Sequence, residues 1–314
     1  MSKMLPDTLI LMVTYRCNLN CIYCPVIKSR STMPFYLAQK ALDIFVSRNP
    51  YLKKIRFFGG EPLIKFDVIK QVINSCGNMG KGRISFDLTT NGTLLSKGIL
   101  KFLADNPRIE LILSLDGDSR TQSLNKVSHN PRVVPYDLLV KKLPFLLKLP
   151  LVTVNMVAAP NQVREFFNNF NHILSLGFKR FNFLPAYYVT WKQAELKILR
   201  GEFNKIASSI IRNKNVYVKN LSFCSETALF NNAVVVDCNG DIFSNNLILS
   251  RAFLGLRNRM KLGNVRDFRI DDLKKGEDLS SLMGGAAYKK IINAAEAPDR
   301  ILTHFVERLK YEKS

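Results

Sequence analysis

The sequence predicts an α/β fold, a partial (β/α)6 TIM-like barrel followed by a smaller C-terminal α+β domain. Short strand-like runs, most of them nearly continuous in apolar residues, alternate with segments of helical spacing through the first two-thirds of the chain. Such runs are typical of parallel strands that are covered on both faces. Polar or glycine-rich motifs follow the first four of these runs. After about residue 215, short strand patterns, turns and a basic helical tail replace the alternation.

Six strands are expected, over residues 9–13, 54–58, 83–89, 109–115, 151–157 and 180–184. Apolar residues recur with helical spacing between and after them, over residues 36–48, 66–76, 96–106, 136–148 and 163–177. Repeated strand and helix units imply a parallel, barrel-like sheet. The ligand site of such a sheet lies at the C-terminal ends of its strands. We therefore expect the barrel over residues 1–215 and the smaller domain over residues 216–314.

The composition is that of an ordered protein, because 47% of the 314 residues are hydrophobic, which excludes a disordered chain. No apolar run reaches the roughly 20 residues of a membrane span, and no cleavage site follows the N-terminal apolar run. The sequence therefore predicts a soluble cytoplasmic protein with no membrane partner. In that compartment clustered cysteines indicate a metal or redox site and not a disulfide framework.

The formal net charge of +21 could indicate a nucleic-acid partner or an acidic substrate. The Lys and Arg residues are, however, spread along the whole chain, mostly as pairs, and there is no arginine-rich arm. This pattern is typical of solvated helix faces. A nucleic-acid partner is therefore disfavoured, although the charge alone leaves it open.

Three of the six cysteines lie in the stretch RCNLNCIYCP, as Cys17, Cys21 and Cys24. Thiolates at this spacing can wrap one face of an iron–sulfur cube, each binding a different iron. The fourth iron then stays open, which is the arrangement of a catalytic metal site. A zinc site would need a fourth ligand from the three histidines, His129, His172 and His304. None of them is close to the loop in sequence, so zinc is disfavoured.

Three further motifs end the next three strands: FFGGEPL at residues 57–63, LTTNGT at 88–93 and LSLDGD at 113–118. Together with the cysteine loop, which follows the first strand, they bring four polar or glycine-rich motifs to one rim of the barrel. A Gly-Gly-Glu-Pro turn alone would be an ordinary strand exit. Its position after an apolar strand, behind a cysteine loop, favours a ligand site instead.

The series TYRCNLNCIYCP, FFGGEPL, TTNGTLL and LSLDG resembles the radical S-adenosylmethionine (SAM) superfamily, specifically its branch with a C-terminal SPASM or twitch domain. The motifs cover residues 8–190, and a weaker resemblance continues to about residue 270. The resemblance implies an enzyme with one 4Fe–4S cluster whose open iron chelates the amino and carboxylate groups of SAM. Reduction, by a donor such as a flavodoxin or ferredoxin, then releases a 5'-deoxyadenosyl radical that takes a hydrogen atom from the substrate.

The same resemblance assigns site residues. Cys17, Cys21 and Cys24 would be the metal ligands and catalytic residues. The expected cofactor-binding residues are Tyr23, Gly59, Gly60, Glu61, Thr90, Asn91, Ser114, Asp116 and Asn155. The two glycines let the backbone approach the methionyl group, and the glutamate offers acceptors to its ammonium. The tyrosine would lie beside adenine, and the threonine, asparagine, serine and aspartate of the two later motifs near the ribose and carboxylate.

Structural roles are the alternatives for several of these residues. The polar residues at the strand ends could cap strands or form turns. Asn155 is a polar residue in an apolar strand, so a hydrogen bond within the core is the alternative to a cofactor contact.

The C-terminal segment departs from the family pattern. The first SPASM motif has a cysteine, a spacer, a glycine and a second cysteine, whereas this chain has Cys224, Gly240 and then Asn245 in place of the second cysteine. We therefore expect a degenerate domain without an auxiliary cluster. A cluster completed by Asn245, Asp237 or Asp241 would be poor, because thiolate is the usual ligand.

An enzyme without an auxiliary cluster should favour reactions with a redox-neutral outcome. Cys224 or Cys238 could then return a hydrogen atom to the substrate. The alternative for each cysteine is a structural role as a small, buried, apolar residue. No cysteine follows Cys238 in the chain.

The sequence favours an iron–sulfur oxidoreductase that modifies a peptide or protein, as in peptide maturation. The alternatives are modification of RNA or of a small cofactor precursor, and a non-catalytic iron–sulfur carrier or scaffold. Because the cysteine loop begins at residue 17, we expect a leader peptide to be bound by a separate partner or by the C-terminal domain. We also expect residues 216–314 to form a wall of the substrate cavity.

Overall fold

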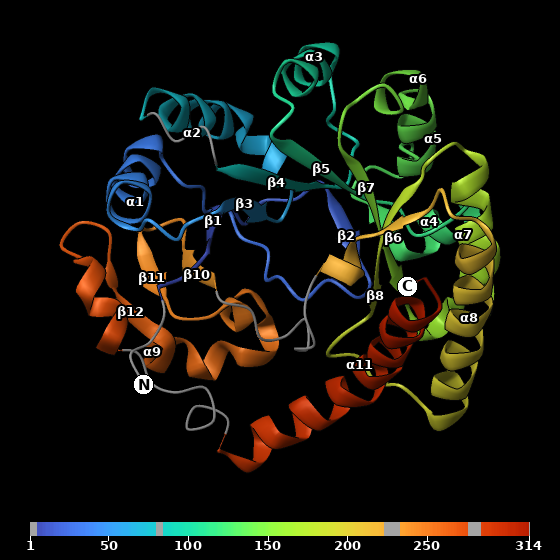
Figure 1. Ribbon diagram of the computed structural model, residues 1–314. Coiled ribbons are helices and arrows are strands. Elements are labelled where there is room, and N and C mark those ends of the chain that lie inside the picture. The colour runs from blue at the N-terminus through green and yellow to red at the C-terminus, as the bar shows by residue number, and fades with distance from the viewer. Residues whose placement is uncertain (1–4, 80–83, 223–232, 276–283, 314) are drawn as a thin grey trace.

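The computed structural model describes residues 5–79, 84–222, 233–275 and 284–313. Six parallel strands form the barrel, in the order in which they occur in the chain. They are β1 (Thr8–Thr14), β3 (Lys54–Gly59), β4 (Ser85–Thr90), β5 (Ile109–Ser114), β7 (Val152–Ala158) and β8 (Arg180–Pro185). The expected α/β partial barrel is therefore confirmed, and helices cover the outside of the curved sheet (Figure 1).

Most of the covering helices coincide with the expected segments: α1 (Phe35–Arg48), α2 (Phe66–Asn78), α3 (Lys97–Asp105) and α7 (Phe166–Ser175). Their apolar residues face the sheet. In α2, for example, Val68, Val72 and Cys76 recur every four residues and are buried, as the period of the α-helix requires. The long helix α8 (Gln193–Arg212) follows β8.

The expected helix over residues 136–148 is wrong in one respect, because the segment forms two short helices. They are α5 (Pro135–Val140) and α6 (Leu143–Leu146). Pro144 lies in the first turn of the second helix, where the missing N–H of proline is tolerated. In the interior of one continuous helix, the same proline would remove a hydrogen bond and break the helix.

Two short elements were not expected and lie close to the cysteines. They are α4 (Ser119–Asn125) and the two-stranded antiparallel sheet of β2 (Leu19–Cys21) and β6 (Lys126–Ser128).

The C-terminal residues extend the barrel sheet at one edge. The strand β10 (Ala233–Val236) pairs with β1 in parallel, and β11 (Asp241–Phe243) and β12 (Lys261–Asn264) follow in antiparallel order. At the other edge β9 (Tyr217–Val218) pairs with β8. The division into two domains at residue 215 stays a prediction, since the described sheet is continuous across it.

The last helix, α11 (Ala286–Lys313), packs against α8 and β8. Its Phe305 ring lies 5.4 Å from that of Phe183 and 4.8 Å from that of Phe203. The short α9 (Arg257–Met260) precedes β12. Figure 1 shows α11 running along the lower side of the barrel, between the β10–β12 segment and α8. Among the described residues, no helix combines the length and apolar character needed to cross a membrane.

Candidate functional site

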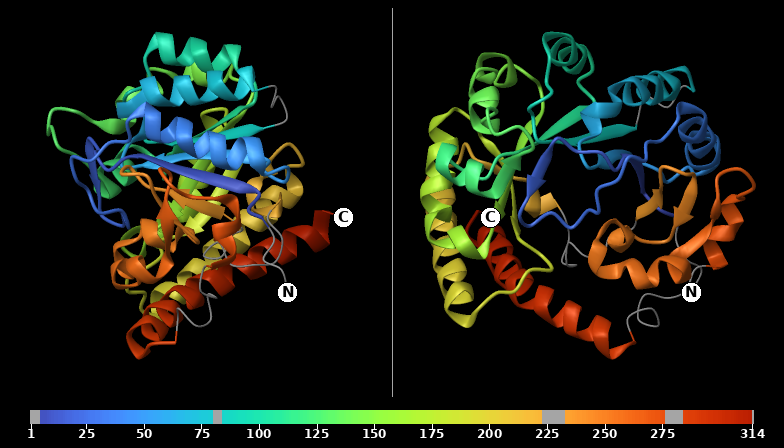
Figure 2. Two further views of the ribbon diagram at one scale, coloured as in Figure 1. Left: turned by 90° about the vertical axis from the view of Figure 1, so that its left-hand side faces the viewer. Right: turned by 180° about the vertical axis from the view of Figure 1, so that it is seen from behind.

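The cysteine loop follows β1, and the other three motifs follow or end β3, β4 and β5. Because these strands are parallel neighbours, all four motifs lie at one rim of the barrel. Figure 2 (right) views the molecule from this end, where the dark blue segment with the cysteines crosses the mouth of the barrel. The sequence-based expectation of a single rim for these motifs agrees with this arrangement.

Cys17, Cys21 and Cys24 are free thiols, each half-buried. The Cys24 N–H donates to the Cys21 carbonyl at 3.2 Å, and the Leu19 N–H donates to Cys17 Sγ at 3.4 Å. Burial raises the pKa of Cys17, and it raises the pKa of Cys21 to about 11. Iron must therefore displace protons when it binds. Three free, partly exposed thiols on one fixed loop fit a cluster that takes three thiolates.

The zinc alternative finds no support in the described residues. His129 comes near the loop, since its N–H donates to the Asn18 carbonyl at 3.4 Å, but its side chain is exposed. His172 contacts the Tyr136 hydroxyl at 2.7 Å. Within the described ranges, no three His, Cys, Asp or Glu side chains are grouped so that they could hold a single metal ion. This includes the three loop cysteines, which would each bind a different iron of a cluster.

Gly59 and Gly60 bring the end of β3 against the cysteine loop. The Gly60 N–H donates to the Thr14 carbonyl at 2.9 Å, and the Glu61 N–H donates to the Arg16 carbonyl at 2.8 Å. A Cβ on either glycine would lie 2.3 Å from one of these two carbonyl oxygens. The glycines thus allow two backbones to touch, a close approach that requires glycine. Their contact with the methionyl group stays a prediction.

Replacing Gly60 by alanine is expected to lower the free energy of unfolding by about 1–3 kcal/mol, because the new Cβ would meet backbone atoms. Urea denaturation measures this change. Gly77→Ala in α2 is the control, since a Cβ there meets nothing within 4 Å, and it should be neutral or stabilising by up to about 1 kcal/mol. An equal loss in both variants would contradict the close approach.

Glu61 is buried, with 1% of its surface exposed, and joins the ends of β3 and β4. Its carboxylate accepts hydrogen bonds from the Thr90 hydroxyl at 2.7 Å, the Asn91 N–H at 2.8 Å and the Leu63 N–H at 3.0 Å. Burial raises the pKa of Glu61, while these bonds act in the opposite direction. Three of the acceptor positions are therefore used inside the protein, and the expected contact with the SAM ammonium remains untested.

The end of β4 also holds the cysteine loop through side chains. Asn91 Nδ2 donates to Asn18 Oδ1 at 3.0 Å, and Asn18 Nδ2 donates to the Thr93 hydroxyl at 2.8 Å. Asn18 lies directly after the first cysteine. The position of Cys17 thus depends on residues from the next motif, a contact that sequence reasoning missed because Asn18 carries no spacing signal.

A buried ionic cluster links the loop to β5 and β6. The Tyr23 hydroxyl donates to Asp116 Oδ2 at 2.5 Å, and Lys126 Nζ donates to the same oxygen at 2.9 Å and to the tyrosine oxygen. The Lys126 and Asp116 side chains are 2% and 0% exposed. Lys126 is also the cross-strand partner of Cys21. The cluster therefore fixes the middle of the cysteine loop.

Lys126 was not foreseen from the sequence. Its neighbours α4 and β6 are too short to show a period, and a lysine in SLNKVS reads as a solvated residue. The expected adenine contact of Tyr23 and the cofactor contact of Asp116 stay predictions.

Ser114, Asn155 and Asn182 are paired across neighbouring strands at the same level of the barrel. All three are half-buried. Asn182 Nδ2 donates to Asn155 Oδ1 at 2.6 Å, so the polar residue in the fifth strand has a partner that the sequence did not reveal. The row presents hydroxyl and amide groups just below the rim. Cofactor contacts by Ser114 and Asn155 are not tested by this geometry.

The three side chains that could complete an auxiliary cluster, those of Asn245, Asp237 and Asp241, have partners within the protein. The Asn245 side chain caps the short 3₁₀ helix that follows it, accepting an N–H at 2.9 Å. Asp237 forms an ion pair with Arg257, and Asp241 forms one with Lys261 at 2.8 Å. Cys224 lies outside the described residues. The expected absence of an auxiliary cluster stays a prediction, and these contacts give the three side chains another role.

Cys238 is buried, and its thiol donates to the Met12 carbonyl at 2.9 Å. Burial, and to a smaller extent Asp237, raises the pKa of this thiol to about 12. At about pH 8 we therefore expect iodoacetamide to alkylate Cys238 on the order of 1,000-fold more slowly than it alkylates the thiol of glutathione. The rate of alkylation of Cys238 should rise as the pH increases. Peptide mass spectrometry measures this rate. A rate close to that of glutathione would contradict the protonated, buried state.

Comparison with known proteins identifies the family. The family model of the radical SAM superfamily matches residues 11–170. An uncharacterized protein of Methanocaldococcus jannaschii is 30% identical over 222 residues, which are 68% of this chain and 74% of the relative. A probable GTP 3',8-cyclase of the same organism is 25% identical over 219 residues, which are 66% of this chain and 70% of the relative.

Two solved structures share the fold at low sequence identity. The structure of anSMEcpe with bound AdoMet and the Kp18Cys peptide matches with a TM-score of 0.71 and 17% identity, over 90% of this chain and 82% of that one. Streptococcus suis SuiB bound to the precursor peptide SuiA matches with a TM-score of 0.66 and 19% identity, over 90% and 67%.

These findings agree with the four motifs at the rim, with the three free thiols of the cysteine loop and with the parallel barrel. They imply that SAM and an iron–sulfur cluster are the cofactors. The chain belongs to the radical SAM superfamily.

Proposed function

We propose that this radical SAM enzyme modifies a peptide or protein substrate. The observation that carries the proposal is a three-thiol loop held at the mouth of a barrel, next to a cavity that the C-terminal residues help to line. That cavity, of about 530 Å³, lies between the chain after β1, with Tyr15 and Ser31, and the C-terminal residues Cys238, Leu254 and Arg257. The peptides bound to the structural neighbours anSMEcpe and SuiB support this substrate class.

The C-terminal residues would then serve as a wall of the substrate site, within the proposed second domain over residues 216–314. Cys238 lines the cavity as a protonated thiol, which is the state that a hydrogen-atom donor requires. The thiol would return a hydrogen atom to a substrate carbon only if the carbon came within reach of the cavity. The thiyl radical left on Cys238 would then be converted back to the thiol by one electron from the external electron donor and one proton from solvent. A redox-neutral change at a peptide carbon is the outcome that fits a chain with a single cluster.

In the proposed enzyme, Cys17, Cys21 and Cys24 would hold the cluster. When bound, the cluster and SAM supply the 5'-deoxyadenosyl radical that abstracts hydrogen from the substrate. The chain itself keeps the loop in position through Glu61 and Asp116. Ser114, Asn155 and Asn182 lie side by side just below the rim. A flavodoxin or ferredoxin would supply the electron.

The test is an anaerobic reaction of the reconstituted protein with SAM, dithionite and a peptide library in D₂O. We expect 5'-deoxyadenosine and a peptide that has gained deuterium at carbon, both detected by mass spectrometry. Cleavage of SAM that leaves every peptide unchanged would contradict the proposed substrate class. The Cys238→Ala variant should cleave SAM but lose the deuterium gain if this thiol is the donor.

A small nucleotide is the second candidate substrate, because one relative is a probable GTP 3',8-cyclase. The same reaction with GTP in place of the peptides separates the two. Consumption of GTP with formation of a cyclised product would favour the nucleotide, whereas unchanged GTP would favour the peptide. RNA is tested in a parallel arm, since the charge leaves it open.

A further inference from the structure

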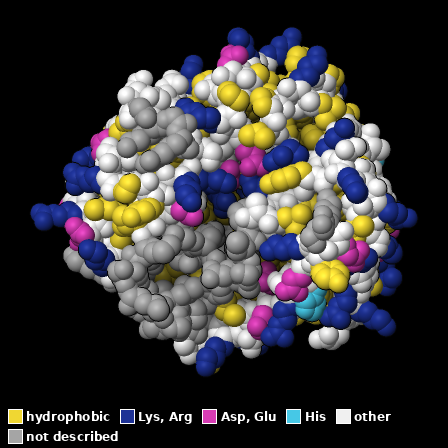
Figure 3. Space-filling model, viewed as in Figure 1, with side chains coloured by type: hydrophobic (Ala, Val, Ile, Leu, Met, Phe, Trp, Pro, Cys, Tyr) yellow, Lys and Arg dark blue, Asp and Glu magenta, His cyan; other side chains and the backbone are white. Residues whose placement is uncertain are grey.

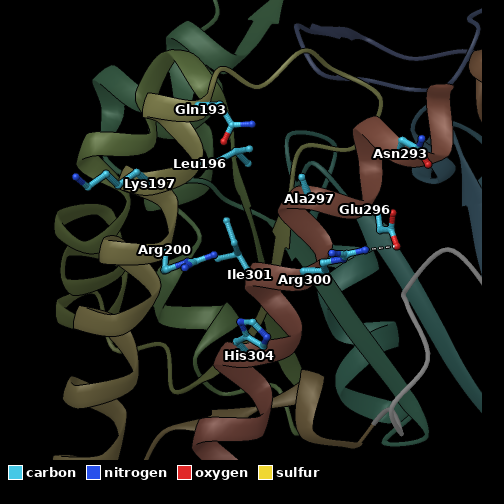
Figure 4. A pocket seen from close by; sticks show the side chains of 10 residues that line it. All are labelled: Gln193, Leu196, Lys197, Arg200, Asn293, Glu296, Ala297, Arg300, Ile301 and His304. Atoms are coloured by element: carbon cyan, nitrogen blue, oxygen red, sulfur yellow. Dashed lines mark hydrogen bonds and ion pairs between the residues drawn. The ribbon is translucent and has the colours of Figure 1, made fainter.

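A second cavity lies on the outside of the barrel, between α8 and α11, far from the cysteines in sequence. It has a volume of about 620 Å³. We define the α8–α11 groove by six of its lining residues: Leu196, Lys197, Arg200, Ala297, Ile301 and His304. Figure 4 shows α8 and α11 on opposite sides of the space, with the Arg200 side chain extending toward Ile301.

The groove carries unpaired positive charge. Lys197 and Arg200 are exposed, and within the described part of the chain neither has a hydrogen-bond or ion-pair partner. The acid of the lining, Glu296, is already paired with Arg300 at 2.9 Å. Lys and Arg side chains gather over much of the surface, as Figure 3 shows for one face. In the groove they lie beside a cavity, where a ligand can reach both charge and apolar surface.

The floor of the groove is apolar. Leu196 and Ala297 are half-buried, and Ile301 is 5% exposed. Polyphosphates and nucleic-acid backbones need cations but gain little from aliphatic surface. A peptide with acidic side chains and an aliphatic residue would satisfy the cations and also bury the floor.

The groove also lies in a suitable place for a substrate that reaches the rim. The helix α8 follows β8 at the C-terminal end of that strand, and the lining residues Gln193 to Arg200 belong to its first turns. One end of the groove is therefore close to the level of the barrel mouth. We therefore expect a segment bound in the groove to extend toward the rim.

We propose that the α8–α11 groove binds an acidic segment of the substrate peptide, outside the part that is modified. This inference rests on the proposed function, because it takes the substrate to be a peptide. The net charge of +21 supports an acidic occupant, since long-range attraction would bring it to this basic surface.

The test measures fluorescence anisotropy of a labelled peptide of repeated Glu-Glu-Leu, without SAM or reductant. We expect Lys197→Glu combined with Arg200→Glu to weaken binding by about tenfold or more. The matched control, Lys214→Glu combined with Lys310→Glu, reverses two exposed charges outside the groove, one just after α8 and one in α11. It should weaken binding by less than about twofold. A Glu-Glu-Ser peptide should bind the unmodified protein more weakly than the Leu peptide.

Equal weakening by the two double variants would overturn the inference, because it would show attraction by net charge alone. Equally tight binding of a single-stranded RNA of matched charge, weakened by the groove variant, would also overturn it in favour of a polyanion. Circular dichroism during thermal unfolding confirms that each variant is folded. Failure of the peptide-modification assay with groove binding intact would count against the proposed function and not against the groove.

Discussion

Replacing Cys21 by alanine is expected to reduce cleavage of SAM to background. The thiol is one of three on the loop, and a cluster that already keeps one iron open cannot lose another ligand and retain its SAM site. The 5'-deoxyadenosine formed under reducing conditions measures the loss, and the bound iron should fall with it. Circular dichroism should show a folded chain, because Cys21 is half-buried and not part of the apolar core.

Cys76→Ala is the matched control for this prediction. Cys76 is fully buried in α2, away from the rim, so the variant should keep its iron and its SAM cleavage. Retained activity in Cys21→Ala, or equal losses in the two variants, would contradict the role of the loop.

Replacing Lys126 by methionine is expected to lower the free energy of unfolding by about 3–5 kcal/mol. The change leaves the Asp116 carboxylate without the ammonium that lies 2.9 Å away, at a place where both side chains are buried. An uncompensated buried charge is costly because the interior solvates it poorly. Urea denaturation of the metal-free protein measures the effect.

Lys101→Met is the control, because its ion pair with Asp105, at 3.0 Å, is exposed on the surface of α3. Its effect should stay within about 0.5 kcal/mol. A change of similar size in both variants would contradict the buried cluster. The reconstituted Lys126→Met protein should also lose iron faster than the unmodified protein. The reason is that Lys126 and Asp116 hold Tyr23, which lies between Cys21 and Cys24 in the sequence.

The barrel could be predicted from the sequence because most strands are rich in apolar residues, although β4 (SFDLTT) is an exception, and most covering helices keep one apolar face. Both patterns are local, so they can be recognised in the sequence without knowing which elements pack against each other. The interruption of the segment over residues 136–148 was signalled by Pro144, but a proline in the first turn is compatible with helix, and the break depends on the packing around it.

The rim could be predicted because parallel strands bring the residues that follow them to one end. The contacts among these residues could not. Glu61, Asn18 and Lys126 act through partners that lie in other motifs, and nothing in the local sequence states which donor a buried acceptor will meet. The same reason explains why the parallel pairing of β10 with β1 was not foreseen, since a short apolar strand does not specify its neighbour.

The iron and sulfide content of the chain after anaerobic reconstitution tests most directly whether the cysteine loop holds the cluster. A single cluster held by Cys17, Cys21 and Cys24 predicts about four iron atoms per chain, falling to near zero when all three cysteines are replaced by alanine. About eight iron atoms per chain, or iron retained in the triple variant, would contradict the claim that this loop holds the only cluster.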